Sequence, residues 1–252
     1  RITEPAEIIE EPGAKEWGEV VHNAVRNFYQ YHFPGGFTEK EMDRATAVME
    51  RELEKALERN RSLAVKPKSA TYIDLNVFKR RMRHFLETEA ERFAGGFEIF
   101  RAALERKAKH HLWINNAQVR VYGFIDRIDL YQGQYCIIDY KTGRIPGRKT
   151  YEIGDDFTEF QLPLYALVFS EEHFEIIGGM MYYEIGRQSR TVDIIDGKDA
   201  VGYLNAFKNK ILVPTIKQIL DPEVAFYQTE NDDFCDHCIY AQLCGEEHGR
   251  ED

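Results

Sequence analysis

The segment GFIDRIDLYQGQYCIIDYKTG, from Gly123 to Gly143, constrains the fold more than any other part of the chain. Two strand-like runs flank Gln132-Gly133, and glycine permits the positive φ that a tight hairpin turn requires. If these two residues form the turn, counting back along both strands places Asp126 directly opposite Asp139. The segment therefore predicts an antiparallel hairpin that brings two carboxylates together.

Side chains alternate between the faces of a strand, so Lys141 should share a face with Asp139, while Tyr140, Ile138 and Cys136 point to the other. Directly opposed side chains have Cβ atoms about 4.5–5.5 Å apart, and two carboxylates at that separation repel. A hard cation such as Mg²⁺ or Mn²⁺ would remove this penalty. The lysine could then hold or activate an attacking water, or offset charge on a phosphate. The alternative is an exposed aspartate pair that the lysine neutralises.

Length and composition set wide limits on the protein. A chain of 252 residues suffices for one large domain or two small ones. With 43% hydrophobic and 30% charged residues, and no apolar run near the roughly 18 residues of a membrane helix, we expect a globular cytoplasmic protein. The net charge of −10 argues mildly against a polyanionic partner, although acidic metal ligands add negative charge that cations neutralise. The chain opens at Arg1 with no methionine, and its first residues lack the apolar core of a signal peptide, so we expect a fragment of a longer protein.

Periodicity along the chain predicts a mixed α/β fold. An amphipathic helix is expected over residues 14–32, a charged and largely solvated helix over 38–60, and a helical block over 75–110 that breaks at Gly95-Gly96. Strands are expected over 112–141, 176–184 and 190–194, and further helices over 156–169 and 199–220. This order suggests a mixed sheet with helices packed on it.

The pattern G-x-I-D, followed by I-D-Y-K-T, resembles motifs of the PD-(D/E)XK nuclease superfamily, in particular the RecB and AddB type attached to helicase-like proteins. The resemblance implies that Asp126 and Asp139 are metal ligands, that the Tyr140 carbonyl is a further ligand, and that Lys141 is the catalytic lysine. It implies a mixed central sheet of the restriction-endonuclease-like kind flanked by helices. The chain would form one nuclease domain, with a helical insertion at 36–111 and a cysteine-bearing tail at 221–252.

His22 stands in the sequence W-G-E-V-V-H of the first predicted helix. A lone helical histidine is more often a surface or satisfied core residue than a ligand. Gly18 and His22 fall four apart, beside the apolar stripe, so His22 could point along the core edge into a cleft. The segment resembles the G-x-x-x-H motif of RecB-type nucleases, which implies that His22 also binds the metal.

The sequence F-Q-L-P-L-Y places Gln161 and Tyr165 on one helix face. It resembles the Q-x-x-x-Y motif of the same family, which implies that both side chains line the site beside the scissile strand. Plain packing is the alternative for both. Pro163 lacks a backbone donor, so it should bend or delay the first turns of this helix.

Basic residues come directly after the hairpin. Arg144, Arg148 and Lys149 lie just beyond Lys141 in the chain, so we expect them to contact DNA phosphates. The other basic stretch, residues 79–83, is expected on a solvated helix face.

Three cysteines close the chain as C-x2-C-x5-C: Cys235, Cys238 and Cys244. Thiolates so spaced commonly hold zinc or an iron–sulfur cluster. They resemble the trailing cysteines of the iron–sulfur version of the family, in which a fourth cysteine precedes the G-x-x-x-H helix. No cysteine precedes His22 here, so we expect a 4Fe–4S cluster in the intact protein that is absent or incomplete in this chain. Zinc with His248 as fourth ligand, or an empty tail, are the alternatives.

The resemblance implies an activity and partners. Water would attack the phosphorus of DNA with the help of one or two Mg²⁺ or Mn²⁺ ions, and Lys141 would position it. The family context implies an exonuclease that works from a DNA end in repair and recombination, with a helicase-like region or subunit as partner. The alternative is an inactive nuclease-like module that binds DNA or scaffolds a helicase complex.

Overall fold

The computed structural model describes residues 14–64, 68–100, 104, 106–114, 116–154, 156–173, 176–186, 189–195 and 199–225. The helices are α1 (Ala14–Asn27), η1 (Phe28–His32), η2 (Glu39–Glu41), α2 (Met42–Arg59), α3 (Arg61–Ala64), α4 (Lys68–Ala94), η4 (Arg148–Thr150), α5 (Gln161–His173), α6 (Ala200–Ala206), η5 (Phe207–Leu212) and α7 (Val213–Leu220). The strands are β1 (Glu98–Ile99), β2 (Arg106–Ile114), β3 (Ala117–Ile125), β4 (Arg127–Tyr131), β5 (Gln134–Lys141), β6 (Ile177–Glu184) and β7 (Arg190–Asp193). The chain divides into two compact units, Arg1–Val213 and Pro214–Asp252.

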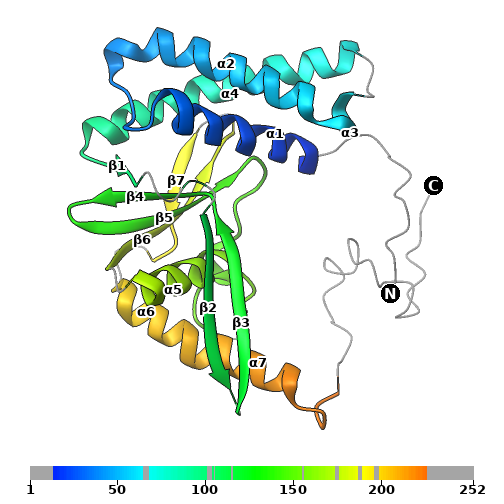
Figure 1. Cartoon of the computed structure of the whole chain (residues 1–252), viewed down its shortest axis with the longest axis vertical. Helices are drawn as coiled ribbons and strands as arrows, with labels where there is room; N and C mark the ends of the chain where they lie inside the picture. Colours follow the sequence, from blue (N-terminus) through cyan, green and yellow to red (C-terminus); the bar gives the residue numbers. More distant parts are fainter. Residues whose placement is uncertain are drawn as a thin grey trace. The chain divides into compact units, whose positions relative to one another are not determined.

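A five-stranded sheet in the order β1-β4-β5-β6-β7 forms the centre of the first unit, and β2 and β3 pair as a separate hairpin (Figure 1). Strands β5 and β6 run parallel, while the other neighbours are antiparallel. Parallel neighbours need a crossover connection, which α5 supplies. The result is the expected mixed sheet flanked by helices, of the restriction-endonuclease-like kind.

The β4–β5 hairpin has the register that the sequence predicts. Tyr131 pairs with Gln134, and Gln132 and Gly133 both have positive φ, 50° and 77°, as a tight two-residue turn requires. Strand β5 also alternates as expected, because Cys136, Ile138 and Tyr140 lie in the core that the sheet shares with α1, α2 and α4. The side chains of Asp139 and Lys141 therefore point to the opposite face.

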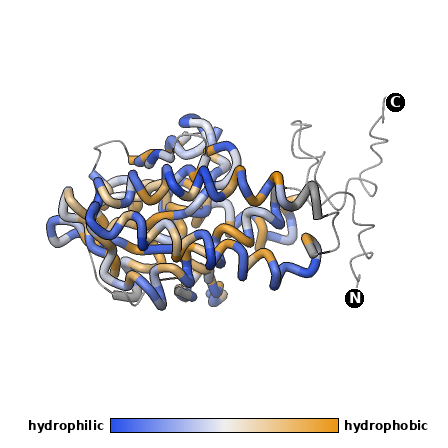
Figure 2. The backbone as a smooth tube through the Cα atoms, turned by 90° about the horizontal axis from the view of Figure 1, so that it is seen from above, coloured by the Kyte–Doolittle hydropathy of each residue, from blue (hydrophilic) through white to orange (hydrophobic). Residues whose placement is uncertain are grey.

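Three helices, α1, α2 and α4, cover one face of the sheet, and α5 lies on the other (Figure 1). Hydrophobic and hydrophilic residues alternate along the covering helices (Figure 2). The expectation that α2 is largely solvated is only partly correct, because one face of the helix, including Val48, Met49 and Leu53, is buried. One apolar stripe suffices to bury a helix whose remaining surface is charged.

The helical block expected over 75–110 is only partly correct. Helix α4 ends at Ala94, and Gly96, with a φ of 92°, lies just beyond it. Residues from Arg106 onward form β2, because their pairing with β3 overrides the local helix propensity. The range 36–111 thus holds η2, α2, α3, α4, β1 and the first six residues of β2. Among the described residues, none of the helices has the length and apolar character needed to cross a membrane.

A buried ionic cluster joins α4 to the sheet. Arg127 on β4 donates to both oxygens of Asp129, at 2.5 and 2.8 Å, and pairs with Glu89 of α4. Arg92 of α4 donates to Asp129 at 2.8 Å. Arg127 also donates to the Tyr140 hydroxyl at 3.2 Å, so this cluster fixes the side chain that lies between Asp139 and Lys141 in the sequence.

Candidate active site

Asp139 and Lys141 lie at the carboxyl end of β5, on the face that α5 covers. The Asp139 side chain is almost completely buried, and its Oδ2 atom lies 2.8 Å from Nζ of Lys141. Strand alternation places the two side chains together, and the ammonium group offsets the buried negative charge. This ion pair is the centre of the candidate site.

Gln161 connects this pair to α5. Its amide nitrogen donates to Oδ1 of Asp139 at 2.6 Å, and its amide oxygen accepts from Lys141 at 2.8 Å. Tyr165, one turn later, has its hydroxyl 3.4 Å from the Gln161 amide nitrogen. The helix begins at Gln161 rather than near residue 156, and Pro163 falls in its first turn, where a missing N–H group is tolerated.

Asp126 lies in the bend between β3 and β4, one residue beyond the last pair of the β4–β5 ladder. Its Oδ2 atom accepts a hydrogen bond of 2.9 Å from the backbone N–H of Tyr140. The carboxylate is therefore anchored to the peptide that comes directly after Asp139.

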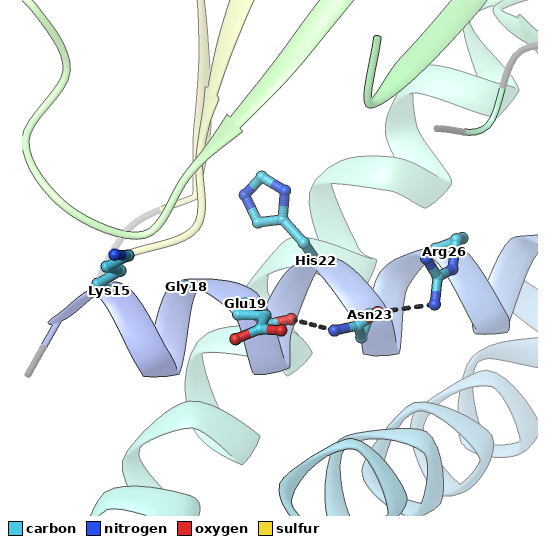
Figure 3. A pocket seen from close by; sticks show the side chains of 6 residues that line it. All are labelled: Lys15, Gly18, Glu19, His22, Asn23 and Arg26. Atoms are coloured by element: carbon cyan, nitrogen blue, oxygen red, sulfur yellow. Dashed lines mark hydrogen bonds between the residues drawn. The ribbon is translucent and has the colours of Figure 1, made fainter. Parts of the chain in front are cut away.

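His22 reaches the same residue from α1. Its Nε2 atom is 3.0 Å from the Tyr140 carbonyl oxygen, and its Nδ1 atom is 3.4 Å from Oδ1 of Asp126. Figure 3 shows the ring projecting from the helix, away from the side chains of Glu19 and Asn23. Gly18, one turn before His22, lies beside the residue after β5, because a Cβ atom there would be in ordinary van der Waals contact with the Thr142 hydroxyl at 3.4 Å. The glycine and the histidine of the G-x-x-x-H spacing thus both face the end of β5.

Burial and mutual repulsion set the electrostatics of the site. Burial, together with the nearby charge of Asp126, raises the pKa of Asp139 to about 6, although Lys141 and His22 oppose this rise. Burial lowers the pKa of His22, but its contact with Asp126 and the charges of both aspartates outweigh this effect and leave that pKa raised. The charges of the two aspartates thus repel each other and favour a positively charged partner at this site.

The chemistry of the donors fits a divalent metal ion. Two carboxylates, a backbone carbonyl and an imidazole are ligands that Mg²⁺ or Mn²⁺ accepts, and a cation would relieve the repulsion between Asp126 and Asp139. As placed, however, the described residues contain no group of three or more His, Cys, Asp or Glu side chains that could hold a metal ion. Instead, the Asp126 carboxylate accepts a hydrogen bond from the Tyr140 backbone, and the Asp139 carboxylate accepts one from Gln161. Convergence of His22, Asp126 and Asp139 on one ion stays a prediction.

The basic residues expected to contact DNA differ in their placement. Arg144 lines a hollow beside Thr142 together with Arg81 of α4 and Arg190 of β7. Arg148 pairs with Glu152 at 2.7 Å and is exposed, as is Lys149. The sequence did not single out Arg190, and it placed Arg81 on a solvated helix face, because no local pattern shows that residues so far apart line one hollow.

The cysteine predictions have two outcomes. Cys235, Cys238, Cys244 and His248 all lie outside the described residues. Cys136 is a buried core residue as expected, and burial raises the pKa of its thiol.

Comparisons with known proteins point to one family. The family model of the PD-(D/E)XK nuclease superfamily matches residues 1–245. No curated protein matches the chain. Among solved structures, one titled "Crystal structure of SSO0001" is similar at 15% sequence identity and a TM-score of 0.34, over 94% of this chain and 87% of that one.

Proposed function

Because the chain belongs to the PD-(D/E)XK nuclease superfamily, we propose that it is a divalent-metal-dependent deoxyribonuclease that hydrolyses phosphodiester bonds at the carboxyl end of β5. One observation carries this proposal: the buried Asp139 and the partly buried Lys141 and Gln161 contact one another in a triad. His22 and Asp126 bind the Tyr140 backbone next to it. Acidic, basic and neutral donors thus meet at one strand end.

Asp126, Asp139, the Tyr140 carbonyl and His22 would hold the metal, Mg²⁺ or Mn²⁺. When bound, it would stabilise negative charge on the phosphate and make water a better nucleophile at neutral pH. The described donors come from α1, the β3–β4 bend and β5, so the site depends on the packing of α1 against the sheet.

Lys141 has a role that a structural ion pair would not need. Its ammonium group is held on one side by Asp139 and on another by the Gln161 amide oxygen. A cation fixed in this way can hold the attacking water or neutralise a phosphate oxygen as charge develops in the transition state. Gln161 would keep the lysine in place. Tyr165 would offer a further hydrogen-bond donor to the DNA strand in the site.

The hollow lined by Arg81, Arg144, Arg190 and the Glu184 that pairs with Arg190 would receive a backbone phosphate next to the scissile one. It adjoins Thr142, one residue after Lys141, so a strand that crosses the active site would pass close to it. Arg148 and Lys149 would contact phosphates farther along. These contacts supply affinity and position rather than sequence specificity.

The finer context is proposed from the motifs. The chain would act as an exonuclease of the RecB and AddB type, next to a helicase-like region or subunit in DNA repair and recombination. Cys235, Cys238 and Cys244 would bind an iron–sulfur cluster in the intact protein, and analysis of iron, acid-labile sulfide and zinc tests this assignment. Zinc without iron would favour the alternative with His248.

Cleavage assays test the function directly. End-labelled linear and circular DNA, single- and double-stranded, are incubated with the protein and Mg²⁺, with EDTA as the metal-free control. We expect cleavage of linear DNA that EDTA and Asp126→Asn each abolish. An intact linear substrate with wild-type protein and Mg²⁺ or Mn²⁺, despite retained DNA binding, would establish the scaffold alternative.

A further inference from the structure

The outer face of the β2–β3 hairpin exposes aromatic and basic side chains that no core requires. It consists of every second residue of the two strands, and we call it the hairpin face: Lys107, Lys109, His111, Trp113, Gln118, Arg120, Tyr122 and Phe124. The three aromatic side chains are 73%, 54% and 54% exposed, for Trp113, Tyr122 and Phe124. Large exposed aromatic groups gathered on one face mark a binding surface.

The opposite face of the hairpin is packed. Ala108, Leu112 and Ile114 are buried, and α5 lies against the hairpin on this side (Figure 1). Tyr165 of α5 packs so closely on Gly123 that a Cβ atom there would lie 2.2 Å from its ring. The hairpin is therefore supported along its inner side, and its outer face is presented on a firm base.

The charge of the hairpin face contrasts with that of the whole chain. Its charged residues are Lys107, Lys109 and Arg120, and none of its eight residues is acidic, in a protein of net charge −10. Within the described part of the chain, no carboxylate lies at ion-pair distance from these three cations. Lys107 Nζ instead lies 5.3 Å from the Tyr122 ring centroid, and the Arg120 guanidinium lies 5.5 Å from it. Cations thus alternate with exposed rings and remain available to an anionic partner.

The chain runs directly from strand β3 of the hairpin to Asp126 of the candidate active site. Strand β3 ends at Ile125, and Asp126 is the next residue. Phe124 is two residues from Asp126, which is about 7 Å along a strand, and Gln118 is eight residues away, about 27 Å. A polymer that follows β3 along this face would therefore run toward Asp126.

We propose that the hairpin face binds single-stranded DNA and guides it to Asp126 and Asp139. Bases would stack on Trp113, Tyr122 and Phe124, while Lys107, Lys109 and Arg120 contact the phosphates between them. Stacking on aromatic side chains together with a cationic track is the general mode by which proteins hold single strands, and duplex DNA cannot use it because its bases are paired and stacked internally. This inference rests on the proposed function only in one respect, that the bound single strand is DNA.

Tryptophan fluorescence gives a direct readout. The chain has two tryptophans, and Trp17 is buried in a stack with Phe78 at 4.7 Å between ring centroids. Trp113 alone of the two is accessible to a base. Oligothymidylate of about 20 nucleotides, longer than the roughly 4–16 that such a surface covers, is titrated into the protein in EDTA to prevent cleavage. We expect quenching in the wild type that Trp113→Phe removes.

Anisotropy of the labelled oligonucleotide then measures affinity. Trp113→Ala should weaken binding about 10-fold, Trp113→Leu similarly, and Trp113→Phe only slightly, because an aromatic ring and not apolar area is required. Tyr31→Ala is the matched control, since Tyr31 is 67% exposed on η1 and should leave affinity unchanged. Changing Lys107, Lys109 and Arg120 together to Gln should make the slope of log affinity against log salt concentration less steep by about 2. A duplex of the same length should bind more weakly and respond little to Trp113→Ala.

The outcomes separate this inference from the proposed function. If Trp113→Ala binds oligothymidylate as tightly as the wild type and the wild type cleaves DNA, the proposal for the hairpin face is wrong and the proposed nuclease activity is supported. If that variant loses affinity but the wild type cuts no DNA, DNA binding by the hairpin face is supported and the proposed nuclease activity is wrong. Equal losses for single-stranded and duplex DNA would refute the preference for single strands. In an active wild type, Trp113→Ala should raise KM for single-stranded DNA with kcat unchanged.

Discussion

At the scale of single residues, the site depends on a buried carboxylate that would be unfavourable without a partner. Asp139 is almost fully buried beside Asp126, and burial with this repulsion raises its pKa to about 6. Lys141 and Gln161 compensate only part of this cost. Such a charge is retained where function needs it, since stability alone would favour a neutral group.

Asp139→Asn should therefore stabilise the metal-free protein at high pH. The folded-state pKa lies above the ordinary 3.8, so the contribution of Asp139 to stability is full below about pH 4 and is lost as the pH rises through about 6. At pH 8 the variant should be more stable by on the order of 2 kcal/mol, and the difference should largely disappear at pH 4. Urea unfolding in EDTA at both pH values measures this. A variant less stable than the wild type at pH 8 would show that the carboxylate is not destabilised by burial.

At the scale of secondary structure elements, close packing of α5 on the β2–β3 hairpin sets the position of Tyr165. Gly123 permits this contact, since any larger residue would overlap the Tyr165 ring. Gly123→Ala should cost about 1–3 kcal/mol and lower the cleavage rate by displacing Tyr165. The control is Gly147→Ala, where φ is −70° and nothing lies within 4 Å of the added methyl group. Equal stability of the two variants in thermal unfolding would argue against the tight contact.

The buried ionic cluster joins α4 to the sheet in the same way. Arg127→Ala would leave Glu89 and Asp129 as buried carboxylates without their main partner, so it should cost about 3–5 kcal/mol. Arg190→Ala is the matched control, because Arg190 pairs with Glu184 at 2.7 Å but is exposed, and its loss should cost at most about 1 kcal/mol. Denaturant unfolding of both variants shows whether the burial of an ion pair, rather than the distance between its charges, determines how much it contributes to stability. Similar losses would contradict this account.

At the scale of the whole molecule, local sequence patterns predicted the central hairpin but not every contact between distant segments. Turn chemistry and strand alternation predicted the β4–β5 register and the face shared by Asp139 and Lys141, and the structure confirms both. Motif resemblance, not spacing, connected His22 to Asp126, since 104 residues separate them. Burial of α2 was missed, because its charged composition hides one apolar stripe. The strand β2 was partly missed, because only its pairing with β3 shows that it is not helical.

The central claim is that this chain cuts DNA with the help of Lys141, and single-turnover cleavage of labelled DNA by Lys141→Ala tests it most directly. The lysine is assigned to the transition state, so the variant should cleave at least about 100-fold more slowly while its DNA affinity and thermal stability stay close to wild type. Lys210→Ala, which removes an exposed lysine from η5, should cleave at the wild-type rate. Cleavage by Lys141→Ala at the wild-type rate would contradict the account.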